Sequence, residues 1–189
     1  MNKYPEYVEI GTKKYKINTS FWDALRCEKI FRDNSICDYE KTLAIIYILL
    51  GEEAMIDFEN QEKIVKILTR YLLCGKKPEE MEGNTDEPSM DFEQDLGRIK
   101  TSFMSDYQID LDKTDMHWWK FHDALEGLTD DSVLSRVRMI REEPLSGKKG
   151  KEREKWEKAK KQVELKYDRP KTEREKELDK YWEEILKKK

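Results

Sequence analysis

Two histidines, three cysteines and two groups of carboxylates are the residues of this chain best suited to chemistry. His117 and His122 lie five positions apart, so they do not share one helix face as zinc-binding histidines at i and i+4 do. The cysteines fit neither a disulfide framework nor a metal-binding spacing; they are Cys27, Cys37 and Cys74. We therefore expect no metal site and no cofactor, and the free thiols suit a reducing compartment.

The carboxylates match no familiar catalytic arrangement. One set lacks the central glycine and the final glutamate of a calcium-binding loop; it consists of Asp106, Asp110, Asp112 and Asp115. We expect Asp112 or Thr114 to cap the helix that follows. The other set, Asp91, Glu93 and Asp95, could serve a nuclease, but it lies at a predicted helix start, where the helix dipole stabilises negative charge. No nucleophile-elbow, phosphate-loop or dinucleotide motif occurs, so we expect a binding protein and not an enzyme.

The elements that position these residues are predicted to be mainly helical. Alternating apolar residues on both sides of Gly11 predict a small β-hairpin over residues 7–17. Apolar residues at spacings of three and four predict six helices after it, over residues 20–31, 39–50, 60–74, 91–107, 115–126 and 131–141. The expected N-terminal caps are Ser20 (in a capping box with Asp23), Asp38, Asn60 and Asp91, and the expected stops are Gly51 and Gly75.

Two of these helices carry features that predict how they pack. The helix over residues 39–50 is apolar on every side, which is typical of a helix buried at the centre of a domain. Gly97 lies inside the helix over residues 91–107, where it costs about 1 kcal/mol relative to alanine. Close approach of a neighbouring helix would explain that glycine.

Composition divides the chain into two parts. Hydrophobic residues make up 37% and charged residues 41% of the 189 positions, and most of the apolar residues precede position 148. Residues 1–147 carry a net charge of −10 and residues 148–189 a net charge of +6, which together give the −4 of the whole chain. We expect a helical core domain over residues 1–143, followed by a charged helical extension over residues 144–189.

The extension is predicted to form two helices that are broken near Pro170. Each has one narrow apolar stripe with a tryptophan, Trp156 in the first and Trp182 in the second. Such stripes suit pairing with the core domain, a second copy or a partner. The alternative is an extension that becomes ordered only when a client binds.

Two other kinds of partner are not favoured by the sequence. The lysine-rich start of the extension suggests nucleic-acid binding. However, interleaved glutamates weaken its positive field, and the acidic body would repel a phosphate backbone. No apolar run reaches the ~20 residues that a membrane span needs. The polar first 18 residues do not match a signal peptide.

One stretch of the chain carries a distinctive motif. It contains Phe-x-Gln-Asp-x-Gly-Arg-Ile-x-x-Ser-Phe, from Phe92 to Phe103, and then His-Trp-Trp-Lys-Phe, from His117 to Phe121. In both segments the sequence resembles the bacteriophage family named after the fifteenth gene product of a long-tailed phage. The resemblance covers roughly residues 18–141. The charged extension is where the chain departs most from that family.

The resemblance implies a phage or prophage protein that acts in tail morphogenesis in the cytoplasm of the bacterial host. It implies a non-enzymatic tail-assembly chaperone that binds the tape-measure protein, the tail-tube protein or both, and that could also form a homo-oligomer. The alternative is a nucleic-acid-associated or regulatory phage protein.

Aromatic residues are the predicted partner-binding residues; they are Trp118, Trp119, Phe121, Trp156 and Trp182. Neighbouring residues on a helix project about 100° apart. We therefore expect one of Trp118 and Trp119 to lie in the core and the other nearer the surface, the alternative being that both are core residues under separate layers.

Overall fold

The computed structural model describes residues 4–77 and 88–166 of the chain. These residues form two strands and a series of helices, as the sequence predicts. The elements are β1 (Tyr7–Ile10), β2 (Lys13–Lys16), α1 (Phe21–Arg32), α2 (Asp38–Leu50), α3 (Glu52–Met55), the 3₁₀ turn η1 (Phe58–Asn60), α4 (Gln61–Leu72), α5 (Leu96–Tyr107), α6 (Trp118–Glu126), α7 (Val133–Glu142) and α8 (Gly150–Val163). The predicted break at Pro170 and the second helix of the extension, with Trp182, lie outside the described residues.

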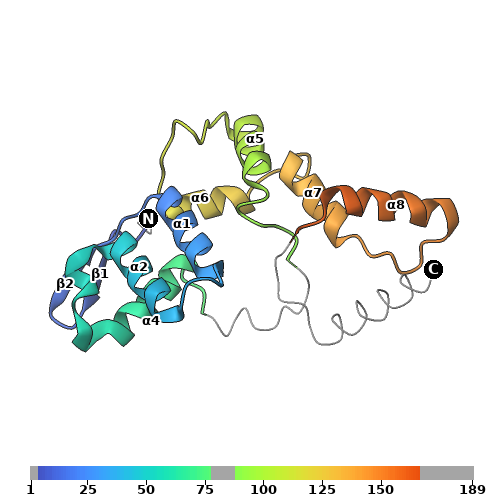
Figure 1. Cartoon of the computed structure of the whole chain (residues 1–189). Coiled ribbons are helices and arrows are strands. Elements are labelled where there is room, and N and C mark those ends of the chain that lie inside the picture. The colour runs from blue at the N-terminus through green and yellow to red at the C-terminus, as the bar shows by residue number, and fades with distance from the viewer. Residues whose placement is uncertain (1–3, 78–87, 167–189) are drawn as a thin grey trace, which may run out of the picture.

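The molecule is elongated along the order of its elements (Figure 1). The hairpin and helices α1, α2 and α4 form one end, α5 and α6 lie in the middle, and α7 with α8 forms the other end. Helix α7 contacts both α5 and α8. The predicted division of the chain between residues 143 and 144 stays a prediction.

The N-terminal hairpin is confirmed. Strands β1 and β2 are antiparallel, with Val8 opposite Tyr15, and Gly11 takes a φ of 63° in the turn between them. One face of the hairpin is apolar and buried, since Ile10 is 2% exposed and Tyr15 is 4% exposed. A two-stranded hairpin is marginally stable alone, so this burial against the helices is what keeps it folded.

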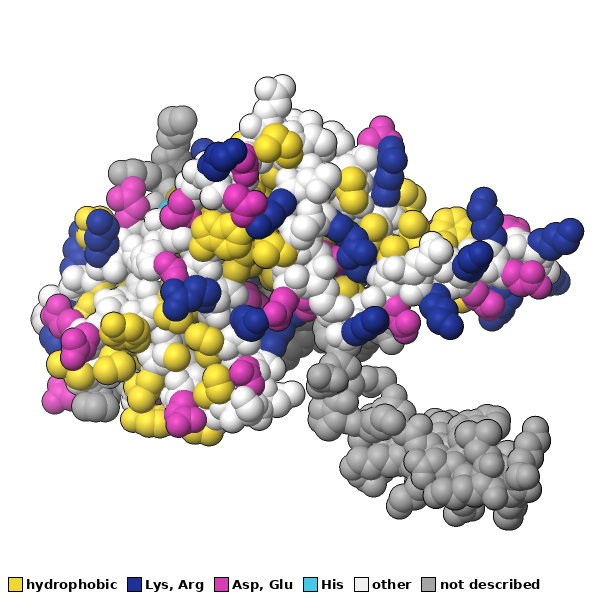
Figure 2. Space-filling model, turned by 45° about the horizontal axis from the view of Figure 1, so that its top comes forward, with side chains coloured by type: hydrophobic (Ala, Val, Ile, Leu, Met, Phe, Trp, Pro, Cys, Tyr) yellow, Lys and Arg dark blue, Asp and Glu magenta, His cyan; other side chains and the backbone are white. Residues whose placement is uncertain are grey.

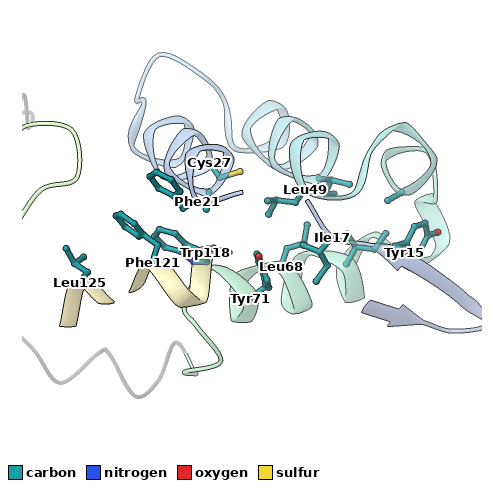
Figure 3. Close-up of a cluster of buried hydrophobic side chains, with 14 of the residues drawn as sticks. Tyr15, Ile17, Phe21, Cys27, Leu49, Leu68, Tyr71, Trp118, Phe121 and Leu125 are labelled. Carbon is teal, nitrogen blue, oxygen red and sulfur yellow. The ribbon is translucent and has the colours of Figure 1, made fainter. Parts of the chain in front are cut away.

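The core is built around stacked aromatic rings (Figure 3). Phe121 on α6 stacks on Phe21 of α1, with ring centroids 4.6 Å apart, and on Phe103 of α5, at 5.2 Å. Trp118, one turn earlier on α6, stacks on Phe121 at 5.7 Å. All four rings are at most 1% exposed, so this stack ties α1, α5 and α6 together by burying a large apolar area.

The prediction that the helix over residues 39–50 is buried is wrong. Only Ile46 and Leu49 of α2 are buried, and Tyr47 is 57% exposed. Helices α1, α3 and α4 contact α2, but most of its apolar residues stay half-buried. Its apolar character on every side therefore leaves apolar side chains at the surface.

The expected helix caps are only partly correct. The Ser20 hydroxyl does not cap α1 but donates to Asp115 at 3.0 Å. Cys37, and not Asp38, is the N-cap of α2. His117 caps α6 in place of Asp112 or Thr114, because its Nδ1 accepts the amide N–H of Trp119 at 3.0 Å.

Further along the chain, Asn60 is the N-cap residue of α4, but its side chain donates to Asp57 instead of capping. Asp91 does cap a turn, since its Oδ1 accepts the amides of Glu93 and Gln94, although α5 itself begins only at Leu96. The packing explanation for Gly97 is wrong, because a Cβ placed there would meet no atom of the described residues within 4 Å.

A buried ion pair joins the start of α5 to the end of α7. The Asp95 side chain is 0% exposed and the Arg141 side chain 8% exposed. The Arg141 guanidinium makes two parallel hydrogen bonds to the Asp95 carboxylate, at 2.6 and 3.0 Å. Arg98 and the amide of Asp91 also donate to that carboxylate. Burial raises the pKa of Asp95, but these donors outweigh it and hold the pKa below its usual value.

The same arginine fixes the end of α8. Arg141 Nε donates to the carbonyl of Val163, the last residue of α8, at 2.6 Å, and its Nη1 donates to the carbonyl of Ser89 at 2.8 Å. In return, Lys160 donates to the backbone carbonyl of Arg141 at 2.6 Å. Three chain segments therefore meet at one side chain.

We expect Arg141→Ala to lower the free energy of unfolding by about 3 kcal/mol, because it removes the main partner of a buried carboxylate. Urea denaturation followed by circular dichroism measures this. Arg136→Ala on the same helix is the control: its pair with Asp131 is exposed, at 62% and 93%, and should contribute less than about 1 kcal/mol. Equal losses in the two variants would show that the buried pair does not hold these segments together.

Candidate partner-binding site

The five predicted partner-binding aromatics do not lie together. Trp118 is 1% exposed and Phe121 is 0% exposed, so neither offers side-chain surface in this structure. Trp119 is half-buried beside them, and Trp156 is half-buried on α8, away from α6 in Figure 1. Trp182 lies outside the described residues. Partner contact by these five residues stays a prediction.

The double tryptophan closes the end of α4. The last carbonyls of a helix have no intrahelical donor. Trp118 Nε1 donates to the carbonyl of Leu72 at 2.9 Å, and Trp119 Nε1 donates to the carbonyl of Tyr71 at 2.8 Å. The expected difference in depth is observed, since Trp118 lies in the core and Trp119 lies nearer the surface.

His117 and Gly75 hold the double tryptophan in place. His117 Nδ1 accepts the amide of Trp119, so its Nε2 carries the proton and donates to the carbonyl of Pro5 at 2.9 Å. Gly75 has a φ of 87°, and a Cβ there would lie 3.1 Å from the Trp119 ring. The His-Trp-Trp segment therefore has a structural role in joining α4 to α6.

The exposed apolar surface lies elsewhere, at the end of the molecule that contains α1 and α2. Phe31 at the end of α1 is 69% exposed, Tyr39 is 59% exposed and Tyr47 is 57% exposed. Figure 2 shows hydrophobic side chains gathered over this end, whereas the narrow opposite end shows alternating positive and negative side chains. Exposed apolar patches are typical of interaction surfaces.

A groove between α1, α2 and α4 is the best candidate for a binding site in the described part of the chain. Its volume is about 220 Å³. Its lining residues are mainly apolar; they are Cys27, Glu28, Phe31, Asp38, Lys41, Thr42, Ile45, Ile46, Val65, Leu68, Thr69, Leu72 and Leu73. We call this feature the α1–α2–α4 groove. Figure 3 shows Leu49 and Leu68, from α2 and α4, in the buried layer that supports this part of the fold.

Two carboxylates line the groove: Asp38 is fully exposed, whereas Glu28 is half-buried. Burial raises the pKa of Glu28, and the positive charge of Arg32 only partly opposes this. Residues 4–77 and 88–166 donate no hydrogen bond to the Glu28 carboxylate, whereas Lys41 in the same groove donates to the carbonyl of Phe31 at 3.1 Å. The groove therefore offers apolar walls and, in Glu28, a half-buried hydrogen-bond acceptor.

A second hollow lies on the opposite side of α2. It is wider and more open, and its polar residues already pair with one another: Asp23 accepts from Asn18 and from Arg26, both at 2.7 Å. Tyr47 and Ile48 of α2 line it. Because its polar groups are satisfied, it offers a ligand less than the α1–α2–α4 groove does.

Sequence reasoning missed the α1–α2–α4 groove. The available signal was the helix over residues 39–50, whose apolar residues face every direction. A buried helix needs neighbours on all sides, and this small domain supplies neighbours on only part of α2. In the described part of the chain no group of three or more side chains could hold a metal ion, and no helix is long and apolar enough to cross a membrane.

The chain matches a family of bacteriophage proteins over residues 1–165, which defines it as a bacteriophage protein. It belongs to the family described as "Bacteriophage Gp15 protein". The match runs through α8, so the expectation that the extension departs from the family applies only beyond residue 165. No curated protein and no solved structure matches the chain.

The three thiols should differ sharply in reactivity. Burial raises the pKa of Cys27 and of Cys74 to about 12, whereas Cys37, next to Asp38 at the groove, is exposed. We expect one thiol per chain to react rapidly with Ellman's reagent near pH 8, and the other two only after unfolding, because the thiolate is the nucleophile. Cys37→Ser should abolish the rapid phase. Rapid reaction of two or three thiols in the folded protein would contradict this structure of the α1–α2 end.

Proposed function

We propose that this protein is a non-enzymatic tail-assembly chaperone that binds helical segments of the tape-measure protein, the tail-tube protein or both in the cytoplasm of the bacterial host. Membership of a bacteriophage family supports a role in the phage life cycle. The observation that carries the proposal is the exposed apolar surface around the α1–α2–α4 groove.

The shape and chemistry of the groove suit a helical client. A groove between helices with apolar walls captures the apolar face of an amphipathic helix, which places anchor residues at spacings of three and four. Phe31 lines the groove and is 69% exposed, so its ring can contact such a helix. A tape-measure protein, as a long helical chain with apolar stripes, presents many such segments.

The alternative, a nucleic-acid-associated protein, has less support. Two of the cations in and before α8 are already engaged by glutamates: Arg153 contacts Glu157 at 2.7 Å, and Lys148 contacts Glu143 at 2.6 Å. Paired cations attract phosphate less than free ones do. Figure 2 shows both signs of charge side by side along this end of the molecule.

Co-expression with the tape-measure protein of the same phage genome tests the proposal. We expect the client to remain soluble and to co-purify with the chain in 1 M salt, because apolar contacts resist screening. Phe31→Asp should weaken the complex about tenfold or more, as loss of an aromatic anchor does.

Met139→Asp is the matched control, because Met139 is 52% exposed but lies on α7, outside the groove. It should leave co-purification unchanged. A client that stays insoluble, or a chain that instead binds DNA tightly at about 0.15 M salt and releases it as salt rises, would overturn the chaperone proposal in favour of the alternative.

A further inference from the structure

The α1–α2–α4 groove has the chemistry of a tryptophan pocket. Its 220 Å³ corresponds to several water molecules at roughly 30 Å³ each, or to one large aromatic side chain. Its walls are mainly apolar. The Glu28 carboxylate is a hydrogen-bond acceptor in the groove, and no described residue donates to it. Tryptophan combines a large apolar body with one N–H donor, so it satisfies both features at once.

The described chain ends near α1, one of the three helices that form this groove. The Gln94 side chain holds Lys166 through two backbone hydrogen bonds, both 2.8 Å. The residues before Gln94 are tied to the end of α1, since Glu93 contacts Lys29 at 2.5 Å and Asp91 contacts Arg32. The chain therefore leaves the described structure beside the α1 turn that contributes Glu28 and Phe31 to the groove.

The residues that follow Lys166 contain a suitable occupant. Trp182 belongs to an apolar stripe at spacings of three and four; the stripe is Leu178, Tyr181, Trp182 and Ile185. The 16 residues after Lys166, ending at Trp182, span about 24 Å as a helix and up to roughly 50 Å when extended, and either length exceeds the roughly 10–12 Å width of a helix such as α1. Trp156 is already engaged on α8, where Lys148 lies 4.9 Å from its ring centroid.

We propose that the C-terminal segment of the same chain occupies the α1–α2–α4 groove, with Trp182 inserted and its indole N–H donating to the Glu28 carboxylate. This contact is intramolecular and does not depend on the proposed function. Its consequence does rest on that function: a client with an aromatic anchor must displace Trp182, so the groove is covered when no client is present.

Fluorine NMR of the full chain tests the proposal. The chain is labelled with 5-fluorotryptophan, which gives five resonances, and the Trp182→Phe variant assigns that of Trp182. A nitroxide is attached to Cys37, the exposed cysteine beside the groove. We expect the oxidised nitroxide to broaden the Trp182 resonance strongly, and reduction by ascorbate to restore it.

Two variants with the same substitution sharpen the test. Thr69→Arg places a charged side chain in the groove from the exposed face of α4, and should remove the broadening. Thr101→Arg makes the same change at an exposed threonine of α5 outside the groove, and should leave the broadening intact. Glu28→Leu should shift the Trp182 resonance, because it removes the acceptor.

Two results would overturn the proposal. One is a Trp182 resonance that stays sharp beside the oxidised nitroxide. The other is broadening that arises only when spin-labelled chains are mixed with separate fluorinated chains, which would make a second copy the occupant. No client is present in this experiment, so its failure leaves the co-expression test of the chaperone proposal untouched.

Discussion

The buried carboxylate of Asp95 constrains the whole second half of the molecule. A carboxylate taken out of water costs several kcal/mol unless cations and hydrogen-bond donors replace the lost water. Here Arg141 comes from α7, Arg98 from α5 and the Asp91 amide from the segment before α5. Arg98 and the Asp91 amide are within four residues of Asp95, whereas Arg141 is 46 residues away, so the carboxylate has all its donors only when α7 packs on α5. The acidic cluster that could have suggested a nuclease is therefore a structural junction.

The residues that carry the family resemblance prove to be those that hold the helices against one another. Asp95 and Arg98 form the buried junction, Phe103 and Phe121 stack in the core, and the double tryptophan binds the end of α4. Residues with so many fixed partners have little freedom to contact anything else. A binding protein is therefore better accommodated by α2 and its neighbours, where exposed apolar side chains make fewer contacts within the described structure.

Local patterns predicted much of the fold. The hairpin followed from alternation around Gly11, and every helix except the short α3 and η1 followed from apolar spacing, because these signals lie within a few residues of one another. The surface of α2 and the cap provided by His117 could not be predicted in this way. Both depend on which distant segments pack nearby, and the hydrophobic pattern of one helix does not say how many neighbours it will have. The groove was missed for the same reason.

Helix α8 is held in an unusual way. None of its residues is buried, and its closing contacts are polar: Arg141 to the Val163 carbonyl, Lys160 to the Arg141 carbonyl, and Gln94 to Lys166 just beyond it. A helix held at the surface largely by polar contacts opens locally at a lower free energy than a packed core does. We therefore expect the amides of α8 to exchange faster than those of α6. Opening of α8 would also move the point from which the C-terminal residues leave the described structure.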